Sequence, residues 1–299
     1  MSRVRALVVG SLVMDLAFRV PQRPEPGEVV IADDFGEYRG GKGYNQAVAL
    51  ARLGAEVTMI GAVGRDAHGE AFLAALEREG VDASYIVRLR GVRTALAVPL
   101  ITPDGDVGFV QHPGANRELA PAHCADLPDC DVLLLQGEVP TPTSLQAARV
   151  IRRRGGLVML NPAPVHEVTA ELVDAATLIT PNEVEARALA GADVADVAAA
   201  EALATQERAA VVTLGPRGAA WADASGSGLV APPVGSAVDA TGAGDSFCAA
   251  LTLALAEGQA LEGAVAFACA AGAHATTRAG AEPGLPTRAE VERLLGTIA

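Results

Sequence analysis

The chain has 299 residues, half of them apolar, and a formal net charge of −13 at pH 7. This composition allows a large core and argues against disorder, and the length suggests one or two domains. The acidic excess argues against a nucleic-acid-binding protein, because such proteins neutralise phosphates with clustered Lys and Arg.

The N-terminal part of the sequence predicts a buried strand followed by a short β-rich region. The run Arg5–Val9 is typical of a parallel strand that ends at a glycine. Met1–Phe18 superficially resembles a signal peptide, but Gly10 and Asp15 interrupt the apolar run, so a first strand fits better. The β-type stretch Glu28–Ile31 indicates a short strand outside the main core.

A helix is predicted at Asn45–Leu53, a strand at Val57–Val63 and a helix at Ala67–Glu79. Strand-like runs at Thr94–Ile101 and Val107–Val110 flank a Pro-Asp-Gly turn and indicate a hairpin. We expect this hairpin to join the earlier β-rich region in a small lid, formed by residues of about 15–39 and 92–112.

Strands and helices then alternate. The predicted strands are Val132–Leu135, Leu157–Leu160, Thr177–Thr180 and Ala210–Leu214. The first predicted helix of this region begins at Thr141-Pro142, and the last one is capped by Thr287 and Glu290. The helices between them are predicted at Glu183–Leu189, Gly244–Glu257 and Leu261–Ala275. Alternation of this kind predicts an α/β fold with a mostly parallel sheet covered by helices. We expect one large domain over residues 1–299, with the lid as its only appendage.

The cysteines and the apolar runs exclude several other classes. Cys124, Cys130, Cys248 and Cys269 show no zinc-type spacing and are expected to be core residues in a reducing compartment. No uninterrupted apolar stretch reaches about 18 residues, so no membrane span is expected. We therefore predict a cytoplasmic protein without nucleic-acid or membrane partners.

Two residue types are rare enough to draw attention. Lys42 is the only lysine, and it lies within Gly40–Gly43, which indicates a site that needs a slim ammonium rather than a guanidinium. The asparagines lie beside glycine- or proline-containing turns and not in apolar stretches: Asn45, Asn116, Asn161 and Asn182. Each is a candidate for chemistry.

The segment Asp239–Asp245 is the strongest functional signal. Its glycines precede an apolar helix, so free N–H groups and the helix dipole there suit a phosphate or a developing anion. A carboxylate beside that anion site is unfavourable for binding alone, and it is best interpreted as a base that takes a proton from an attacking hydroxyl. The plain alternative is an N-terminal Asp favoured by the dipole.

Other glycine-rich segments have weaker interpretations. Gly40–Asn45 could place backbone amides, Lys42 and Asn45 against a polyhydroxylated ligand. Gly36–Gly43 nearly matches the phosphate loop of P-loop NTPases but lacks the final hydroxyl residue. Gly242–Gly244 is half of a dinucleotide fingerprint, with Phe247 in place of the third glycine, so a Rossmann oxidoreductase is a remote alternative.

Two segments near strand ends suit a nucleotide. Asn182 and Glu185 share one helix face and could hold Mg²⁺ directly or through water. Thr213–Gly218 ends a strand with two glycines, which is plausible for a nucleotide edge.

Together these segments resemble the PfkB-type carbohydrate kinases, and the ribokinase branch of that family most closely. The resemblance is carried, in order, by Gly10–Asp15, Gly40–Ala47, His112–Asn116, Gln136–Glu138, Asn161–Pro164, Thr180–Glu183 and Asp239–Asp245. It implies a ribokinase-like fold and ATP-dependent phosphorylation of the primary hydroxyl of a pentose, with ribose as the first candidate.

The resemblance also implies roles for individual residues. Asp245 would be the catalytic base, beside an anion hole of Gly242, Ala243 and Gly244. Sugar hydroxyls would meet Asp15, Gly41, Lys42, Asn45, Glu138 and Asp245. ATP would meet Asn182, Thr213, Gly215, Arg217, Gly218, Gly244 and Cys269, with Glu185 positioning Mg²⁺ indirectly. Potassium would be held by Asp239, Thr241, Ala275, Arg278, Gly280 and Gly284. The lid would be shared across a homodimer.

Two residues depart from the family pattern and leave the substrate open. Val13 stands where this branch usually has an asparagine, which suggests tolerance of a sugar that lacks a hydroxyl, such as 2-deoxyribose. Tyr44 adds bulk that could stack on a nucleoside base. A deoxyribokinase and a nucleoside kinase are therefore alternatives, and a catalytically dead sugar-binding regulator is the alternative from another class.

Overall fold

A computed structural model describes residues 3–191 and 194–296 of the chain. Its large sheet contains nine of the described strands in the order β13-β12-β11-β10-β9-β8-β1-β4-β5. All neighbouring strands pair parallel except β11–β12 and β12–β13, which pair antiparallel, so β12 alone runs in the opposite direction. The predicted mostly parallel α/β architecture is therefore confirmed.

The strands of the large sheet lie close to their predicted positions. They are β1 (Arg5–Val9), β4 (Glu56–Gly64), β5 (Ile86–Leu89), β8 (Val132–Gln136), β9 (Leu157–Asn161), β10 (Leu178–Ile179), β11 (Ala209–Thr213), β12 (Ala219–Asp223) and β13 (Gly226–Val230). The short β5, β12 and β13 were not predicted. β5 and β13 are the two edge strands of the sheet, and β12 lies between β13 and β11.

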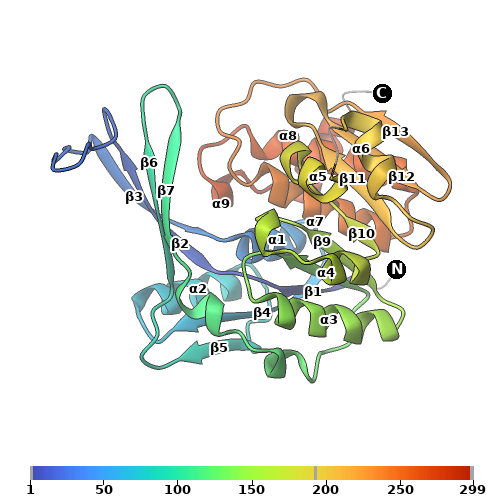
Figure 1. The fold of residues 1–299 in the computed structure, drawn as a ribbon, viewed down its shortest axis with the longest axis horizontal. Coiled ribbons are helices and arrows are strands. Elements are labelled where there is room, and N and C mark those ends of the chain that lie inside the picture. The colour runs from blue at the N-terminus through green and yellow to red at the C-terminus, as the bar shows by residue number, and fades with distance from the viewer. Residues whose placement is uncertain (1–2, 192–193, 297–299) are drawn as a thin grey trace.

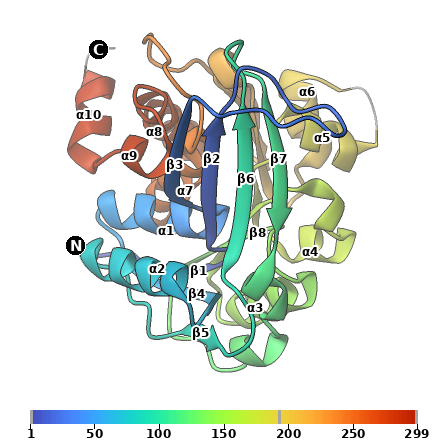
Figure 2. The ribbon, with the colours of Figure 1, turned by 90° about the vertical axis from the view of Figure 1, so that its left-hand side faces the viewer.

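Helices cover both faces of this sheet (Figure 1, Figure 2). One core cluster joins the sheet to α1 (Lys42–Arg52), α2 (Ala67–Arg78), α7 (Ala243–Ala256), α8 (Leu261–Ala275) and α10 (Arg288–Gly296). The opposite cluster joins it to α3 (Thr141–Arg153), α4 (Ala170–Ala175), α5 (Glu183–Ala190) and α6 (Asp196–Leu203). None of the described helices is long and apolar enough to cross a membrane.

A second, smaller sheet stands away from the large one (Figure 1). Its order is β3-β2-β6-β7, from β2 (Val13–Arg19), β3 (Asp34–Gly40), β6 (Ala95–Ile101) and β7 (Val107–His112). Two separated segments therefore pair in one small sheet, as predicted. The strand predicted at Glu28–Ile31 is wrong, because these residues form an open loop in which Val29 is 85% exposed.

The cysteines have no disulfide partners. Cys124, Cys248 and Cys269 are buried and Cys130 is half-buried, so all four are free thiols. Burial raises the pKa of the Cys124 thiol to about 12, which keeps it protonated and unreactive.

Candidate active site

The carboxyl ends of the parallel strands carry most of the predicted functional segments. Gly10 and Ser11 follow β1, Glu138 follows β8, Asn182 follows β10, and the segment 214–218 follows β11. In open parallel sheets the ligand site lies at this edge, where loops from neighbouring strands meet. Helix α7, which carries Asp245, reaches the same edge through its N-terminus (Figure 1).

Asp245 is buried in the first turn of α7 and is held by two amides of α1. Asn45 Nδ2 donates to its Oδ2 at 2.8 Å, and Gln46 Nε2 donates to its Oδ1 at 3.1 Å. Burial raises the pKa of Asp245, while Lys42 and the two amides oppose that rise. A carboxylate with a raised pKa and fixed orientation is suited to accept a proton.

A chain of buried amides supports this arrangement from below. Gln136 Nε2 donates to Gln46 Oε1 at 2.6 Å, and Gln46 Nε2 also lies 3.4 Å from Asn161 Oδ1. Asn161 in turn donates to the carbonyl of Thr180 at 3.0 Å. The amides therefore link α1, β8, β9 and the end of β10, and Gln46 cannot rotate without breaking several bonds.

Lys42 lies among three carboxylates. Burial would lower its pKa, but Asp245, Glu138 and Glu185 outweigh burial and the pKa lies above its ordinary value. The lone ammonium is therefore charged, and its loop reaches the same site as Asp245. Three carboxylates around one ammonium leave an excess of negative charge.

Glu138 organises the loop that begins α1. Its Oε2 accepts from Lys42 N at 2.9 Å and from the Ser11 hydroxyl, which also accepts from Gly43 N at 3.3 Å. Gly41 has φ 91°, and a Cβ there would lie 2.8 Å from Val13 N. Only glycine fits this position, because both the conformation and the close approach exclude a side chain.

The N-terminus of α7 leaves N–H groups free. Gly242 is the N-cap with φ 80°, and Ala243 N donates back to Ala240 O at 3.2 Å. Gly244 N and Asp245 N have no acceptor in the described residues, as expected at positions without an intrahelical partner. In the segment expected to form the anion hole, the amides of Gly244 and Asp245 are therefore available to a ligand, whereas the N–H of Ala243 is used within the turn.

Asp15 approaches from the small sheet. Its Oδ2 lies 2.5 Å from the place a Cβ of Gly40 would take, so it sits directly over the start of the glycine loop. Burial and the neighbouring Glu138 raise the pKa of Asp15 to about 7. Two residues earlier on the same strand face, Val13 is buried against Ala95 and Ala97.

The two segments that were predicted to bind a nucleotide lie next to each other and are joined by hydrogen bonds. Asn182 and Glu185 form the capping box of α5, in which Asn182 N and Nδ2 each donate to the Glu185 carboxylate at 2.9 Å. Thr213 N donates to Pro181 O at 2.9 Å, which places the Thr213–Gly218 turn beside this cap. These segments therefore lie at one edge.

Arg217 and Cys269 are less available than expected. Arg217 is ion-paired with Glu183 and Asp196 at 2.6 Å each. The Cys269 thiol is buried and donates to Val230 O at 3.8 Å. In this arrangement neither side chain is free to bind a ligand. The contacts with ATP expected of these two residues are therefore limited to their backbone atoms unless the side chains leave their present partners.

The residues expected to hold potassium come from two segments that lie together. Asp239 Oδ2 accepts from Gly280 N at 2.8 Å, and Asp239 N donates to Thr276 O at 3.1 Å. A Cβ at Gly284 would lie 2.5 Å from Ala275 O. Burial would raise the pKa of Asp239, but hydrogen bonds from Gly280 and Thr241 outweigh it, so the pKa is lowered and the carboxylate is ionised.

No group of three or more His, Cys, Asp or Glu side chains able to hold a metal occurs among the described residues.

Tyr44 does not line the site. It is fully buried, packs edge-on against Phe72 at a centroid distance of 5.1 Å, and donates to Glu282 Oε2 at 3.0 Å. The expectation that it stacks on a nucleoside base is therefore wrong. The ring fills the core beside Phe72 and does not face the site.

Sequence reasoning missed the roles of Ser11, Gln46 and Gln136. Each lies within a segment singled out above, but no role was assigned to its side chain. A signal did exist for Gln136, since it is the polar residue of an otherwise apolar strand, where an unpaired amide would be costly.

Comparisons with known proteins agree with this geometry. Residues 4–288 match the model of the pfkB family of carbohydrate kinases. The chain is 38% identical to the ribokinase of Bacillus subtilis over 292 residues, covering 96% of this chain and 98% of that one.

Solved structures give the same result. The ribokinase of Thermotoga maritima superposes with a TM-score of 0.88 at 32% identity, covering 98% of this chain and 99% of that one. The ribokinase of Arabidopsis thaliana complexed with ribose and ATP gives 0.87 at 29% identity, with the same coverage of 98% and 99%. The expected ribokinase-like fold is confirmed.

Proposed function

Since the chain belongs to the pfkB family of carbohydrate kinases, we propose that it transfers the terminal phosphoryl group of ATP to the primary hydroxyl of ribose. It is a phosphotransferase with an alcohol group as acceptor. The observation that carries this function is Asp245, buried at the N-terminus of α7 and oriented by Asn45 and Gln46.

The reaction needs a base and an anion site next to each other. Asp245 takes the proton of the sugar hydroxyl while the hydroxyl oxygen forms a bond to the γ-phosphorus, and the bond from that phosphorus to the bridging oxygen of ADP breaks. The free N–H groups of Gly244 and Asp245 stabilise the transferring phosphoryl group. The products are the sugar 5-phosphate, ADP and a proton.

The sugar lies between the two sheets in this proposal. Asp15 approaches from the small sheet, and Lys42 and Glu138 from the edge of the large one. Gly41, Asn45 and Asp245 complete the set of contacts with sugar hydroxyls. Their mix of charged acceptors, an ammonium and an amide suits several neighbouring hydroxyl groups.

ATP occupies the other half of the edge. Its contacts are with Gly244 and with the backbone of Asn182, Thr213, Gly215, Arg217 and Gly218, while Cys269 lies below them. The excess of negative charge around Lys42 favours ATP as its magnesium complex. Glu185 would act on that ion through water, since its carboxylate is engaged with Asn182.

Potassium supports the anion site in this proposal. Asp239, Thr241, Ala275, Arg278, Gly280 and Gly284 would hold it, mainly through backbone oxygens. Their segment is bonded to the turn that precedes α7. A bound cation would add positive potential near the transferring phosphoryl group.

The small sheet acts as a lid and as a dimer interface. The strand register places Phe18, Phe35, Val98 and Val110 on the face opposite Asp15. Phe35 is 49% exposed and Val110 is 69% exposed, an apolar face that needs cover. A homodimer through this face would cover it. Sedimentation of the wild type and of a Val110→Lys variant tests the proposed dimer, and a monomeric wild type would reject it.

A 2-deoxypentose is the second candidate substrate, and Val13 favours it. The Val13 side chain is apolar and packs against Ala95 and Ala97 beside Asp15, so it cannot bind a hydroxyl group. An apolar wall does not strongly reject an added hydroxyl, with a typical limit of about 10² in kcat/KM, so ribose remains a substrate.

One assay tests the function. Turnover of ATP is measured with ribose, 2-deoxyribose, a nucleoside and other sugars, with potassium and with choline as the counter-cation. We expect turnover with a pentose and stimulation by potassium. An absence of turnover with every sugar would reject the proposed function, and NAD binding instead would restore the oxidoreductase alternative.

A further inference from the structure

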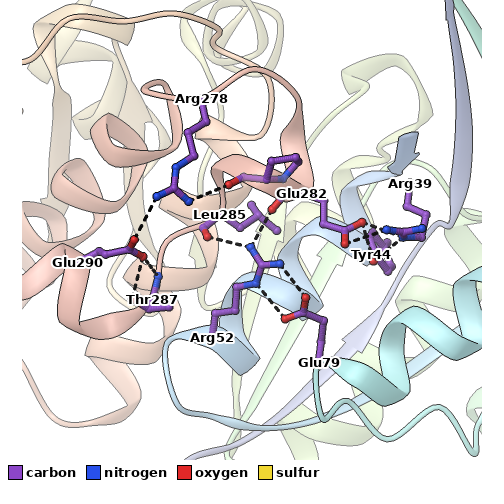
Figure 3. A network of polar contacts seen from close by, with 10 residues as sticks. Arg39, Tyr44, Arg52, Glu79, Arg278, Glu282, Leu285, Thr287 and Glu290 are labelled. Carbon is purple, nitrogen blue, oxygen red and sulfur yellow. Dashed lines mark hydrogen bonds and ion pairs between the residues drawn. The ribbon is translucent and has the colours of Figure 1, made fainter. Parts of the chain in front are cut away.

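A cluster formed by Arg39, Tyr44 and Glu282 joins the small sheet to the C-terminal part of the chain (Figure 3). Arg39 Nε and Nη2 donate to the two oxygens of Glu282 at 2.8 and 3.0 Å. Tyr44 donates to Glu282 Oε2 at 3.0 Å. The carboxylate is therefore held by donors from β3 and α1, which lie more than 230 residues earlier in the sequence.

The cluster is shielded enough to fix its geometry. The Arg39 side chain is 30% exposed and that of Glu282 is 15% exposed. The bond is bidentate, which is the arrangement that restricts orientation most strongly. An exposed ion pair would contribute little, but removal of either partner here leaves a shielded charge without its partner.

A second arginine holds the backbone of the same segment. Arg52 Nη1 donates to Glu282 O at 2.8 Å and to Leu285 O at 3.0 Å, while its other nitrogens bind Glu79 (Figure 3). The helix α9 (Ala281–Gly284) is a single turn and has no stability of its own. Its position is set by these outside contacts.

The segment held in this way touches the phosphate-binding turn. A Cβ added at Gly242 would lie 3.0 Å from Ala281 Cα and 3.1 Å from Ala281 Cβ, so the two residues are already in contact. Gly242 is the N-cap of α7, two residues before the free amide of Gly244. A shift of Ala281 therefore changes the support of the turn that carries the anion hole.

The other end of the cluster touches the sugar-binding loop. Arg39 immediately precedes Gly40, and Tyr44 immediately precedes Asn45, which donates to Asp245. We propose that Glu282 is a positioning residue, which holds Ala281 against Gly242 and fixes the phosphate-binding turn relative to the sugar-binding loop. This inference rests on the proposed kinase function.

The test compares two matched variants, Glu282→Gln and Glu79→Gln. Each loses the carboxylate of a partly shielded, bidentate Arg–Glu pair, with closest N–O distances of 2.8 and 2.7 Å, but only Glu282 lies next to Ala281. In Glu79→Gln, Arg52 keeps both of its carbonyl acceptors. Melting temperature, kcat and both KM values are measured for the wild type and for each variant.

We expect similar losses of melting temperature in the two variants but different kinetics. Glu282→Gln lowers kcat by about tenfold while the sugar KM changes by less than about threefold, since displacement of the anion hole acts on the transition state. Glu79→Gln keeps the wild-type kcat. Equal kcat values in all three proteins, or equal losses in both variants, would overturn the inference.

A double-mutant cycle covers the case in which Glu282→Gln folds poorly. Arg39→Met and the double variant Arg39→Met with Glu282→Gln are measured in the same way, and the double variant should lose no more kcat than one single variant. Additive losses contradict a shared role. A wild-type protein without kinase activity rejects the proposed function itself, so the two failures are distinguishable.

Discussion

The two halves of the site are built differently. At the edge of the large sheet, Asp245 is fixed by Asn45 and Gln46, and Gln46 by Gln136. On the small sheet, the carboxylate of Asp15 accepts no hydrogen bond from the described residues, and Val13 lies beside it in an apolar patch. In the proposed reaction the base is therefore already oriented before substrate binds. The carboxylate on the small sheet is left to be satisfied by the sugar.

This difference separates catalysis from selection. A base and an anion site that are already oriented do not have to be reorganised during the reaction. A carboxylate without a partner in a half-buried place gains most when a sugar hydroxyl supplies one. Changes at Asp245 and at the amides that orient it should therefore act on kcat, and changes at Val13 and Asp15 on KM and on the choice of sugar.

The largest effect is expected for Asp245→Asn. The proton acceptor is lost, while the remaining oxygen of the asparagine can still accept from one of the two buried amides, so kcat should fall by about 10³-fold with ATP binding retained. The measurement is steady-state turnover together with calorimetric binding of a non-hydrolysable ATP analogue. Turnover near the wild-type rate would remove Asp245 as the base.

Gln46→Leu is expected to have the next largest effect. The leucine cannot donate to Asp245, so the carboxylate loses a bond that favours its charged form and its pKa rises further. We expect kcat to fall by about 10-fold to 100-fold and the acidic limb of the kcat/KM profile to move to higher pH.

A purely structural role of Gln46 predicts something else. The variant would then lose melting temperature and the amount of active enzyme, but the surviving enzyme would show an unshifted pH profile. If the pH profile of Gln46→Leu coincides with that of the wild type, Gln46 does not control the protonation of Asp245.

Most residues of the proposed catalytic half could be selected from the sequence because they stand out chemically. Lys42 is the only lysine, and the four asparagines all make specific contacts: Asn45 with Asp245, Asn116 with the backbone of Leu12, Asn161 with Thr180 and Asn182 with Glu185. The helix predicted at Asn45–Leu53 begins three residues earlier, at Lys42, because a glycine at position 43 hides a helix start, and it ends at Arg52.

The parts that were not predicted depend on contacts between distant segments. Tyr44 is adjacent in sequence to the proposed substrate-binding loop, yet its ring lies in the core. It is held there by packing against Phe72 and by a hydrogen bond to Glu282. The bond from Ala243 N to Ala240 O is likewise a property of the folded turn. The β-branched run Glu28–Ile31 has the composition of a strand, but Asp34–Gly40 pairs with β2 instead.

Val13→Asn sharpens the comparison on the side of the small sheet. An amide at this position can bind a sugar hydroxyl, so we expect the ratio of kcat/KM for ribose to that for 2-deoxyribose to rise by about tenfold, mainly through the ribose KM. Val13→Ala is the control, because it removes bulk without adding a donor. An equal rise of the ratio in Val13→Ala would assign the effect to space rather than to hydrogen bonding.

The smallest effect is expected for the pH dependence of stability at Asp15. Its pKa is raised to about 7 by burial and by Glu138, so the folded protein binds a proton more tightly than the unfolded chain. The resulting loss of folding stability is absent below the ordinary Asp pKa of 3.8, grows as the pH rises and is constant above about pH 7. Asp15→Asn should therefore melt a few degrees above the wild type at pH 8, with a difference that shrinks toward pH 4.

The same titration sets the affinity for the sugar. Below pH 7 the protonated Asp15 is a weaker acceptor for hydroxyl groups, so the sugar KM of the wild type should rise as the pH falls, while that of Asp15→Asn is high and flat. Melting curves and KM values at five or six pH values test both statements. If Asp15→Asn is less stable than the wild type at pH 8, the Asp15 carboxylate already has a partner in the free protein. The small sheet then leaves no unsatisfied carboxylate for the sugar.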